Sequence, residues 1–390
     1  MEGSGPVETA PRATRIFTAF LRLGLTAFGG PAMIAYIGRM AVERRRWLDE
    51  HTFRDGVALV QAVPGASAMQ MAAYVGLKSR GVRGALAAYA GFGLPAFLLM
   101  LLFSVLYSGT RHLPVANALF TGLQVIVVAI VASATWSFGT DSLKTVRAGV
   151  IAAIAATLLW FGVSPFLVIA GAAVAGLVLY ASAPNRRATA FPASRAWLWP
   201  AVMLVALVAA ALAVLFIVNR PRFDLAVLML RIDLFAFGGG FASLPLMLFE
   251  IVKVRGWMSS NTFMDGIALG QVTPGPIVMT TTFVGYLVYG LSGAVIATLA
   301  IFTPSFLIIV IVTPFYDRLK SAAWFARATR GILASFVGLL FYVMVKFALA
   351  VPWDLPRALL GAAALAALLR KVDILYVVLA GAALSLLLFR

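Results

Sequence analysis

The sequence contains no cysteine and only two histidines, His51 and His112. Without cysteine the chain can form neither a disulfide nor a thiolate metal site. Two histidines alone do not make a metal cluster, so we expect no metal and no cofactor. The common motifs of hydrolases, zinc proteases and nucleotide-binding proteins are also missing, and we therefore predict that the protein is not an enzyme.

Charged residues are scarce as well. They make up 12% of the chain, whereas hydrophobic residues make up 62%, and a soluble domain has about a quarter of its residues charged. The stretch between Asp265 and Asp317 contains no charged residue. It is long enough for two membrane spans of about 20 residues each. The composition therefore predicts that the lipid bilayer is the solvent for most of the chain.

The net charge of +17 would suggest a nucleic-acid partner in a soluble protein. Here the arginines lie in short loops between apolar segments, which is typical of the positive-inside rule, so we expect no nucleic-acid partner. The distribution of Lys and Arg between the loops predicts the orientation of this multi-pass membrane protein. Its N-terminus is expected in the cytoplasm and its C-terminus on the periplasmic or extracellular side. The polar start has no apolar signal-peptide core and predicts a cytoplasmic tail over 1–15.

The chain repeats itself at a distance of about 209 residues. Both copies contain a Phe-Gly-Gly block, a Thr-Phe-x-Asp-Gly stretch and a Gln-x-x-Pro-Gly block. These blocks occupy residues 28–30, 52–56 and 61–65 in the first copy, and 237–239, 262–266 and 271–275 in the second. A duplicated membrane chain with glycine and proline breaks at matching places is typical of secondary transporters.

The repeat divides the chain into regions. We expect a first membrane repeat over 16–182, a linker over 183–224 and a second repeat over 225–390. The linker contains one extra transmembrane segment at about 197–218, so the two copies are an odd number of crossings apart and face opposite ways. The predicted fold is an all-α polytopic membrane protein with about 13 transmembrane segments in two inverted repeats with broken helices. The arginine-rich run at 42–51 falls on the predicted outer side, which leaves a re-entrant segment and twelve spans as the alternative.

Each copy places an arginine inside its first apolar segment, at Arg22 and at Arg231. An arginine at the centre of a span costs about 2.5–3.5 kcal/mol on insertion scales, so a repeated one indicates a binding role. The alternative is that the side chain reaches the interface along its aliphatic stem. Only the second copy has an acid two residues further on, at Asp233.

Glycine and proline interrupt two segments in each copy. The Pro-Gly pairs predict that a span is divided into two half-helices, because proline favours the first turn of a helix over its interior. The start of a half-helix presents free amides and a partial positive charge, which can bind an anion. We therefore predict a substrate-binding site made of these breaks and nearby polar groups: Arg22, Gly29, Gly30, Gln61, Pro64, Gly65, Ser67, Arg231, Gly238, Gly239, Gln271, Thr273, Pro274 and Gly275.

The breaks also have structural explanations. A Pro-Gly pair can be a kink, and a Gly-Gly pair can allow close helix packing. Replacing one Pro-Gly pair by two alanines would restore helix propensity by about 3 kcal/mol for the proline and about 1 kcal/mol for the glycine. We therefore expect such a variant to fold at least as well as the parent and to bind the anion less well.

Five carboxylates are candidates for proton coupling: Asp55, Asp265, Asp233, Glu250 and Glu43. Asp55 and Asp265 occupy matching positions just before the Pro-Gly segments. A carboxylate at membrane depth is a candidate proton carrier. The alternative for these two is structural, since a carboxylate at the start of a helix is stabilised by the helix dipole.

The blocks described above resemble the chromate ion transporter family in its long two-domain form. The likeness covers residues 16–137 and 225–350, and the paired order of the blocks makes it specific. The resemblance implies a cytoplasmic-membrane protein that exports chromate and is driven by the proton-motive force. It also implies that sulfate, which has the same shape and charge, competes for the site.

From the residues alone, the sequence predicts an inverted-repeat transporter that handles an anion. With the resemblance added, the predicted function is a secondary transporter that exports chromate, with sulfate as a second substrate left open. Two alternatives use the same residues, namely an oxyanion channel and an importer of sulfate-like anions. An assembly protein without a substrate would leave the matched breaks unexplained. The oligomeric state also stays open, with a homodimer as one alternative.

Overall fold

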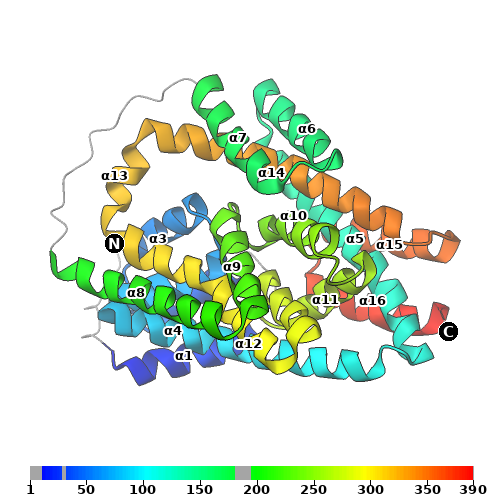
Figure 1. The fold of residues 1–390 in the computed structure, drawn as a ribbon, viewed down its shortest axis with the longest axis horizontal. Coiled ribbons are helices and arrows are strands. Elements are labelled where there is room, and N and C mark those ends of the chain that lie inside the picture. Colours follow the sequence, from blue (N-terminus) through cyan, green and yellow to red (C-terminus); the bar gives the residue numbers. More distant parts are fainter. Residues whose placement is uncertain (1–10, 29–31, 181–194, 390) are drawn as a thin grey trace. The chain divides into compact units, whose positions relative to one another are not determined.

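A computed structural model describes residues 11–28, 32–180 and 195–389, and the ordered elements in these ranges are all helices, with no strand among them (Figure 1). Five helices are long and apolar enough to cross a membrane, and shorter apolar helices accompany them. The five are Ser67–Thr110, Pro114–Ser142, Trp199–Val218, Ile277–Phe315 and Ala323–Ala350. The predicted all-α membrane fold is therefore confirmed.

In the part of the first copy that the structure describes there are seven α-helices and one π-helix, and α8 (Arg195–Val218) follows them. In chain order the elements of the first copy are α1 (Ala13–Thr26), α2 (Ala32–Gly38), the π-helix η1 (Arg39–Arg44), α3 (Glu50–Ala62), α4 (Ser67–Thr110), α5 (Pro114–Ser142), α6 (Val146–Trp160) and α7 (Pro165–Leu179).

The second copy follows the same plan with more short turns. Its elements are α9 (Arg220–Phe235), η2 (Gly240–Ala242), α10 (Ser243–Met247), the π-helix η3 (Leu248–Val254), α11 (Ser260–Val272), η4 (Ile277–Met279), α12 (Thr280–Val312), η5 (Thr313–Phe315), α13 (Tyr316–Ser321), α14 (Ala323–Ala350), α15 (Leu355–Leu369) and α16 (Ile374–Leu388).

The repeat extends to the backbone conformation. The kink inside α4 at Gly81 has φ 61°, and the kink inside α12 at Gly290 has φ 63°. Between α6 and α7, Gly162 has φ 88°, and at the matching place between α15 and α16, Lys371 has φ 65°. A lysine in the left-handed region is uncommon. Its presence there indicates that the duplicated chain path is retained beyond the last shared sequence block.

The chain forms two compact units that do not follow the two copies. Unit 1 comprises Met1–Leu101, Arg187–Gly240 and Thr273–Leu319, and unit 2 comprises the rest of the chain. Each unit therefore combines residues of both copies. In unit 1, α9 packs along α12, and α8 packs against both (Figure 1).

In unit 2, α14 packs against α5, α6 and α7, while α5 also packs against α15 and α16 (Figure 1). Small residues bring these helices together. A Cβ added at Gly338 of α14 would lie 1.9 Å from the carbonyl oxygen of Ala152 in α6. One added at Gly331 would lie 2.1 Å from the carbonyl oxygen of Ala172 in α7. Close approach of this kind stabilises helix pairs in lipid through van der Waals packing, because the hydrophobic effect does not drive helices together there.

Candidate functional site

The first helix break lies in unit 1, between the end of α3 at Ala62 and the start of α4 at Ser67. Pro64 and Gly65 form the break, as predicted from the sequence. Gly65 has φ 121°, and its N–H donates to the carbonyl oxygen of Ala236 at 2.9 Å. A backbone bond to the second copy therefore holds the first break open.

A buried carboxylate supports the start of α4. The backbone N–H and the hydroxyl of Ser305 both donate to Oδ2 of Asp233, at 2.8 and 2.7 Å. The N–H of Ala66 in turn donates to Oγ of Ser305 at 2.9 Å. Asp233 is 1% exposed, and its other oxygen, Oδ1, is buried without a hydrogen-bond partner. An unsatisfied oxygen on a buried carboxylate is costly unless it takes up a proton or a ligand.

The second helix break separates the end of α11 at Val272 from the start of η4 at Ile277. Gly275 has φ 126°, close to the value at Gly65. The three threonines that follow, Thr280–Thr282, are fully buried. The first two close back onto the preceding turn, and the third shares a hydrogen bond of 2.7 Å with Thr298.

The Phe-Gly-Gly block of the second copy lies next to both half-helix starts. Gly238 and Gly239 have φ 95° and 93°. A Cβ added at Gly239 would lie 3.4 Å from Oγ of Ser67, at the start of α4. One added at Gly240 would lie 2.8 Å from Cγ2 of Ile277, at the start of η4. Unit 1 thus brings two helix starts, each with unsatisfied amides and a partial positive charge, to one glycine-rich turn.

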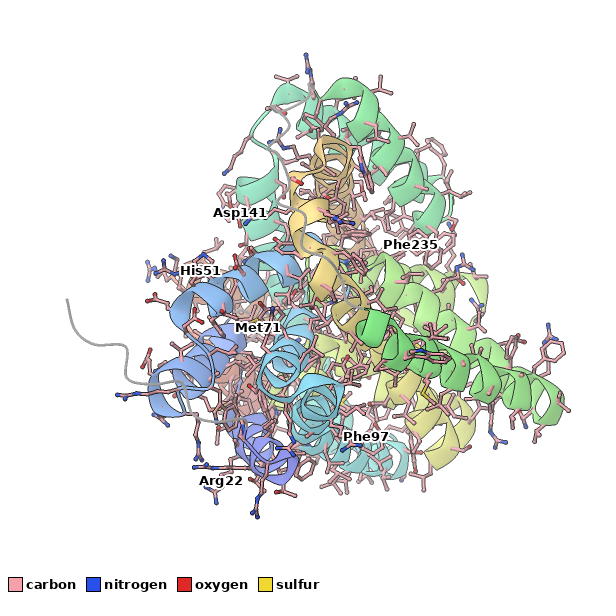
Figure 2. All side chains as sticks on the ribbon, turned by 90° about the vertical axis from the view of Figure 1, so that its left-hand side faces the viewer. Arg22, His51, Met71, Phe97, Asp141 and Phe235 are labelled. Carbon is pink, nitrogen blue, oxygen red and sulfur yellow. The ribbon has the colours of Figure 1, made fainter. Side chains whose placement is uncertain are left out.

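The other predicted binding residues lie in different parts of the structure. Gly29 and Gly30 lie outside the described residues. Arg22, Arg231 and Gln61 are exposed, and Figure 2 shows Arg22 at the edge of the ribbon. Gln271 belongs to unit 2, and its Nε2 is buried without a hydrogen-bond partner. Pro64, Gly65, Ser67, Gly238, Gly239, Thr273, Pro274 and Gly275 all belong to unit 1.

The predicted proton-coupling carboxylates differ in burial. Asp233 and Asp265 are buried, and so is Glu250, which forms an ion pair with Arg255. Glu43 is exposed. The side chain of Asp55 is 42% exposed and lies 3.3 Å from Nδ1 of His51. Figure 2 shows His51 at the edge of the ribbon.

The sequence analysis missed the two partners of Asp265, both in unit 2. The hydroxyl of Tyr107 and Nε2 of Gln124 each donate to one of its carboxylate oxygens, both at 2.8 Å. Gln124 is an amide within a long charge-free apolar segment. That isolation was the signal that could have found it, because buried amides need partners.

Among the described residues, no group of three or more His, Asp and Glu side chains is placed to hold a metal ion. The polar groups described at the two breaks are instead backbone amides, hydroxyls, the Asp233 carboxylate and the buried carboxamide of Gln70, whose Nε2 donates to the carbonyl oxygen of Pro64 at 2.6 Å. Amides and hydroxyls at helix starts are suited to binding an anion without a metal.

Comparison with known proteins gives a family and no structural template. The sequence matches the family described as chromate transporter over residues 14–177 and 223–386, one match in each copy. It is 41% identical to an uncharacterized transporter of Methanocaldococcus jannaschii, over 95% of this chain and 92% of the relative. It is 32% identical to a chromate transport protein of Pseudomonas aeruginosa, over 96% of this chain and 92% of the relative. No solved structure matches.

A shorter relative aligns with part of the chain. An uncharacterized transporter of Bacillus subtilis is 31% identical over 42% of this chain, which is 96% of its own length. Almost the whole of that protein is therefore matched by less than half of this one. Such a relative has the length expected of a single copy of the repeat.

Proposed function

We propose that this chain, which belongs to the chromate transporter family, exports chromate across the cytoplasmic membrane and is driven by the proton-motive force. Sulfate, a tetrahedral dianion of the same charge, is the competing substrate. The observation that carries the proposal is the meeting of two half-helix starts at the Gly238–Gly240 turn in unit 1.

A dianion bound at this turn carries two negative charges, which the site must offset. Each helix start contributes about half a positive charge and several free amides. Ser67 adds a hydroxyl at the start of α4, and Thr273 is buried before the start of η4. Arg22 and Arg231 are the proposed sources of further positive charge. Gln61 is the proposed directional donor, and Gln271, which belongs to unit 2, stays a prediction from the sequence.

Proton coupling is assigned first to Asp233. It is the carboxylate that is hydrogen-bonded, through Ser305, to the start of α4. Protonation would remove a negative charge beside the proposed anion site and, with it, the cost of burying a charged carboxylate whose Oδ1 has no hydrogen-bond partner. Anion binding and proton binding would then be linked, and each would change the affinity for the other by the same factor. Asp55, Asp265, Glu250 and Glu43 are the remaining candidates.

The test is uptake of labelled chromate into inverted membrane vesicles that contain the protein. We expect saturable uptake that is inhibited by sulfate and abolished by a protonophore. Uptake that does not saturate and ignores the protonophore would identify an oxyanion channel. Uptake into right-side-out vesicles alone would identify an importer.

Orientation is tested separately. A reporter fused to the C-terminus is expected on the periplasmic or extracellular side, and a reporter inserted near Arg187 is expected in the cytoplasm. These positions follow from an N-terminus in the cytoplasm and an odd number of spans. Finding both ends of the chain on the same side of the membrane would contradict the thirteen-span arrangement and favour twelve spans.

A further inference from the structure

Unit 2 contains a polar cavity that shares no lining residue with the helix breaks. It has a volume of about 270 Å³ and is lined by residues of α4, α5, α11 and α15. The polar side chains that matter most are Tyr107, Arg111, Gln124, Asn261, Asp265 and Arg357. Arg111 and Asn261 are exposed, whereas Tyr107 and Asp265 are buried, so the cavity leads from the surface to the Asp265 carboxylate.

The carboxylate of Asp265 is held in a fixed position. Tyr107 and Gln124 each donate to it at 2.8 Å, one to each oxygen. Both are neutral donors, so they orient the carboxylate without cancelling its charge. Desolvation penalises a charged group that has no opposite charge bonded to it. This side chain is therefore suited to exchange a proton with the cavity.

Two arginines line the same cavity. Arg357 forms an ion pair with Asp354, and its guanidinium lies 4.9 Å above the ring of Phe389. Its Nε is buried without a hydrogen-bond partner. Arg111, on the exposed side, supplies a second guanidinium. Planar guanidinium groups bind tetrahedral oxyanions through paired N–H donors.

The other charged side chains on elements that pack near Asp265 have partners of their own. Glu250, on η3, forms an ion pair with Arg255. Lys346, on α14, lies over the ring of Trp160 at 4.8 Å. The charge balance of the cavity therefore depends on Arg111, Arg357 with its partner Asp354, and Asp265 itself.

We propose that this cavity is a second binding site for a tetrahedral oxyanion, held by Arg111 and Arg357, and that a proton on Asp265 strengthens the binding. With Asp265 charged, the positive charge of Arg111 is balanced and a dianion is repelled. With Asp265 protonated, the cavity carries a net positive charge and accepts one. The proposal rests on the proposed function only in taking a chromate-like dianion as the ligand.

The cavity combines residues of both copies, and the repeat reproduces it only in part. Tyr316 and Lys320 match Tyr107 and Arg111, but Leu333 replaces Gln124 and Ala148 replaces Arg357. The matching carboxylate, Asp55, is 42% exposed and lies beside His51. The full set of cavity side chains therefore occurs once in the duplicated sequence.

The absence of cysteine allows a local test. Asn117, which also lines the cavity, is replaced by cysteine in the full chain, and its reaction with a maleimide is timed with and without sulfate or molybdate. These anions are used because chromate oxidises thiols. At about ten times the dissociation constant, a bound oxyanion should slow labelling about tenfold. Protection should be stronger at mildly acidic than at mildly basic pH. Ser142→Cys, at the far end of α5, should show no protection.

Three further variants test the proposal. Arg357→Gln should abolish protection of the cysteine. Arg111→Gln should also abolish it, and this variant decides the test where Arg357→Gln does not fold. Asp265→Asn should keep protection but make it independent of pH. Protection that survives both arginine variants, or its absence in the parent for both anions, overturns the cavity site. Chromate uptake by the cysteine-free parent is measured in parallel, so failure of the transport function is recognised separately.

Discussion

The two helix breaks have the same backbone conformation and differ in the side chains that surround it. Gly65 and Gly275 have φ 121° and 126°, and each follows a proline at the end of a helix. The duplication therefore kept the shape of the break. The side chains placed against it changed, and with them the charge that each break presents to an anion.

At the first break, the N–H of Ala66 is bonded to Ser305, which is bonded to Asp233. The break is thus already occupied by an internal carboxylate, one hydroxyl away from the amide. A free dianion at this helix start would be repelled by Asp233 unless the carboxylate is protonated.

At the second break, the three matching positions carry no polar side chain. Pro276 has no N–H, and Ala96 and Gly24 take the places of Ser305 and Asp233. A Cβ at Gly275 would lie 2.7 Å from Cβ of Ala96. Gly24 itself packs against the backbone of Phe92, leaving no room for an acid. We therefore expect the two breaks to have different roles, with the proton at the first break and the anion drawn toward the second.

The largest effect is expected from Asp233→Asn. Asparagine keeps an oxygen for Ser305 but does not titrate, so uptake of chromate into inverted vesicles should no longer respond to a protonophore. Asp224→Asn is the control, because Asp224 is exposed, pairs with Arg220 and is not among the candidates for proton coupling, and it should keep the response. A protonophore-sensitive Asp233→Asn protein would contradict the assignment of the proton to the first break.

The next effect concerns stability. Ser305→Ala leaves the N–H of Ala66 without a partner and removes a donor from Asp233. Each loss costs roughly 1–3 kcal/mol, so the free energy of unfolding should fall by roughly 2–6 kcal/mol. The reciprocal change, Ala96→Ser, should cost far less, because a serine in a membrane helix can bond to its own preceding turn. Unfolding of the purified protein in detergent measures both. Equal costs at the two positions would show that the breaks are equivalent after all.

A third prediction tests what the copies share. A Cβ at Gly84 would lie 2.2 Å from the carbonyl oxygen of Gly76, and one at Gly293 would lie 2.1 Å from that of Gly285. Gly84→Ala and Gly293→Ala should therefore each destabilise unit 1, by a similar amount of about 1–3 kcal/mol. Gly149→Ala, which meets no atom within 4 Å, is the control and should be neutral or slightly stabilising. A clear difference between the two glycine variants would show that the shared backbone is not equally constrained.

The positions of the breaks could be predicted because proline and glycine act on the residues next to them. Their partners could not be predicted. Ser305 is 239 residues from Ala66 and 72 from Asp233. No local pattern records a contact over such a separation. The structure also overturns one expectation, that alanines at a Pro-Gly pair would leave folding intact. Gly65 has a φ that strains any other residue, and a Cβ there would lie 2.2 Å from Oγ of Ser305.

The matched carboxylates also have environments that the sequence could not predict. Asp55 and Asp265 stand at matching positions, each before a glycine, and the sequence treats them alike. In the folded chain Asp265 is buried between Tyr107 and Gln124, while Asp55 faces outward. The repeat predicts where a side chain is attached. Its environment depends on the helices that pack against it, and those differ between the copies.

The smallest effect is expected at the helices that precede the breaks, where the copies use different N-caps. Oδ1 of Asp49 accepts from the N–H of Thr52 at 2.8 Å, and Oγ of Ser259 accepts from the N–H of Thr262 at 3.1 Å. Replacing either cap by alanine should cost about 0.5–2 kcal/mol at neutral pH. The bond from the N–H of Thr52 lowers the pKa of Asp49 below its ordinary value.

The folded-state pKa of Asp49 is thus lower than that of the unfolded chain. The stabilisation by this cap is complete above the unfolded pKa and is lost as the pH falls through the folded pKa. The cost of Asp49→Ala should therefore shrink in acid, whereas the cost of Ser259→Ala should not change, since serine does not titrate. The thermal midpoint of each variant, followed from neutral to acidic pH, measures this. Asp49→Ser keeps a cap without the charge. In this variant the stabilisation by the cap should no longer depend on pH, as is expected for Ser259. If its cap remains as sensitive to acid as the parent's, the carboxylate of Asp49 is not the titrating group.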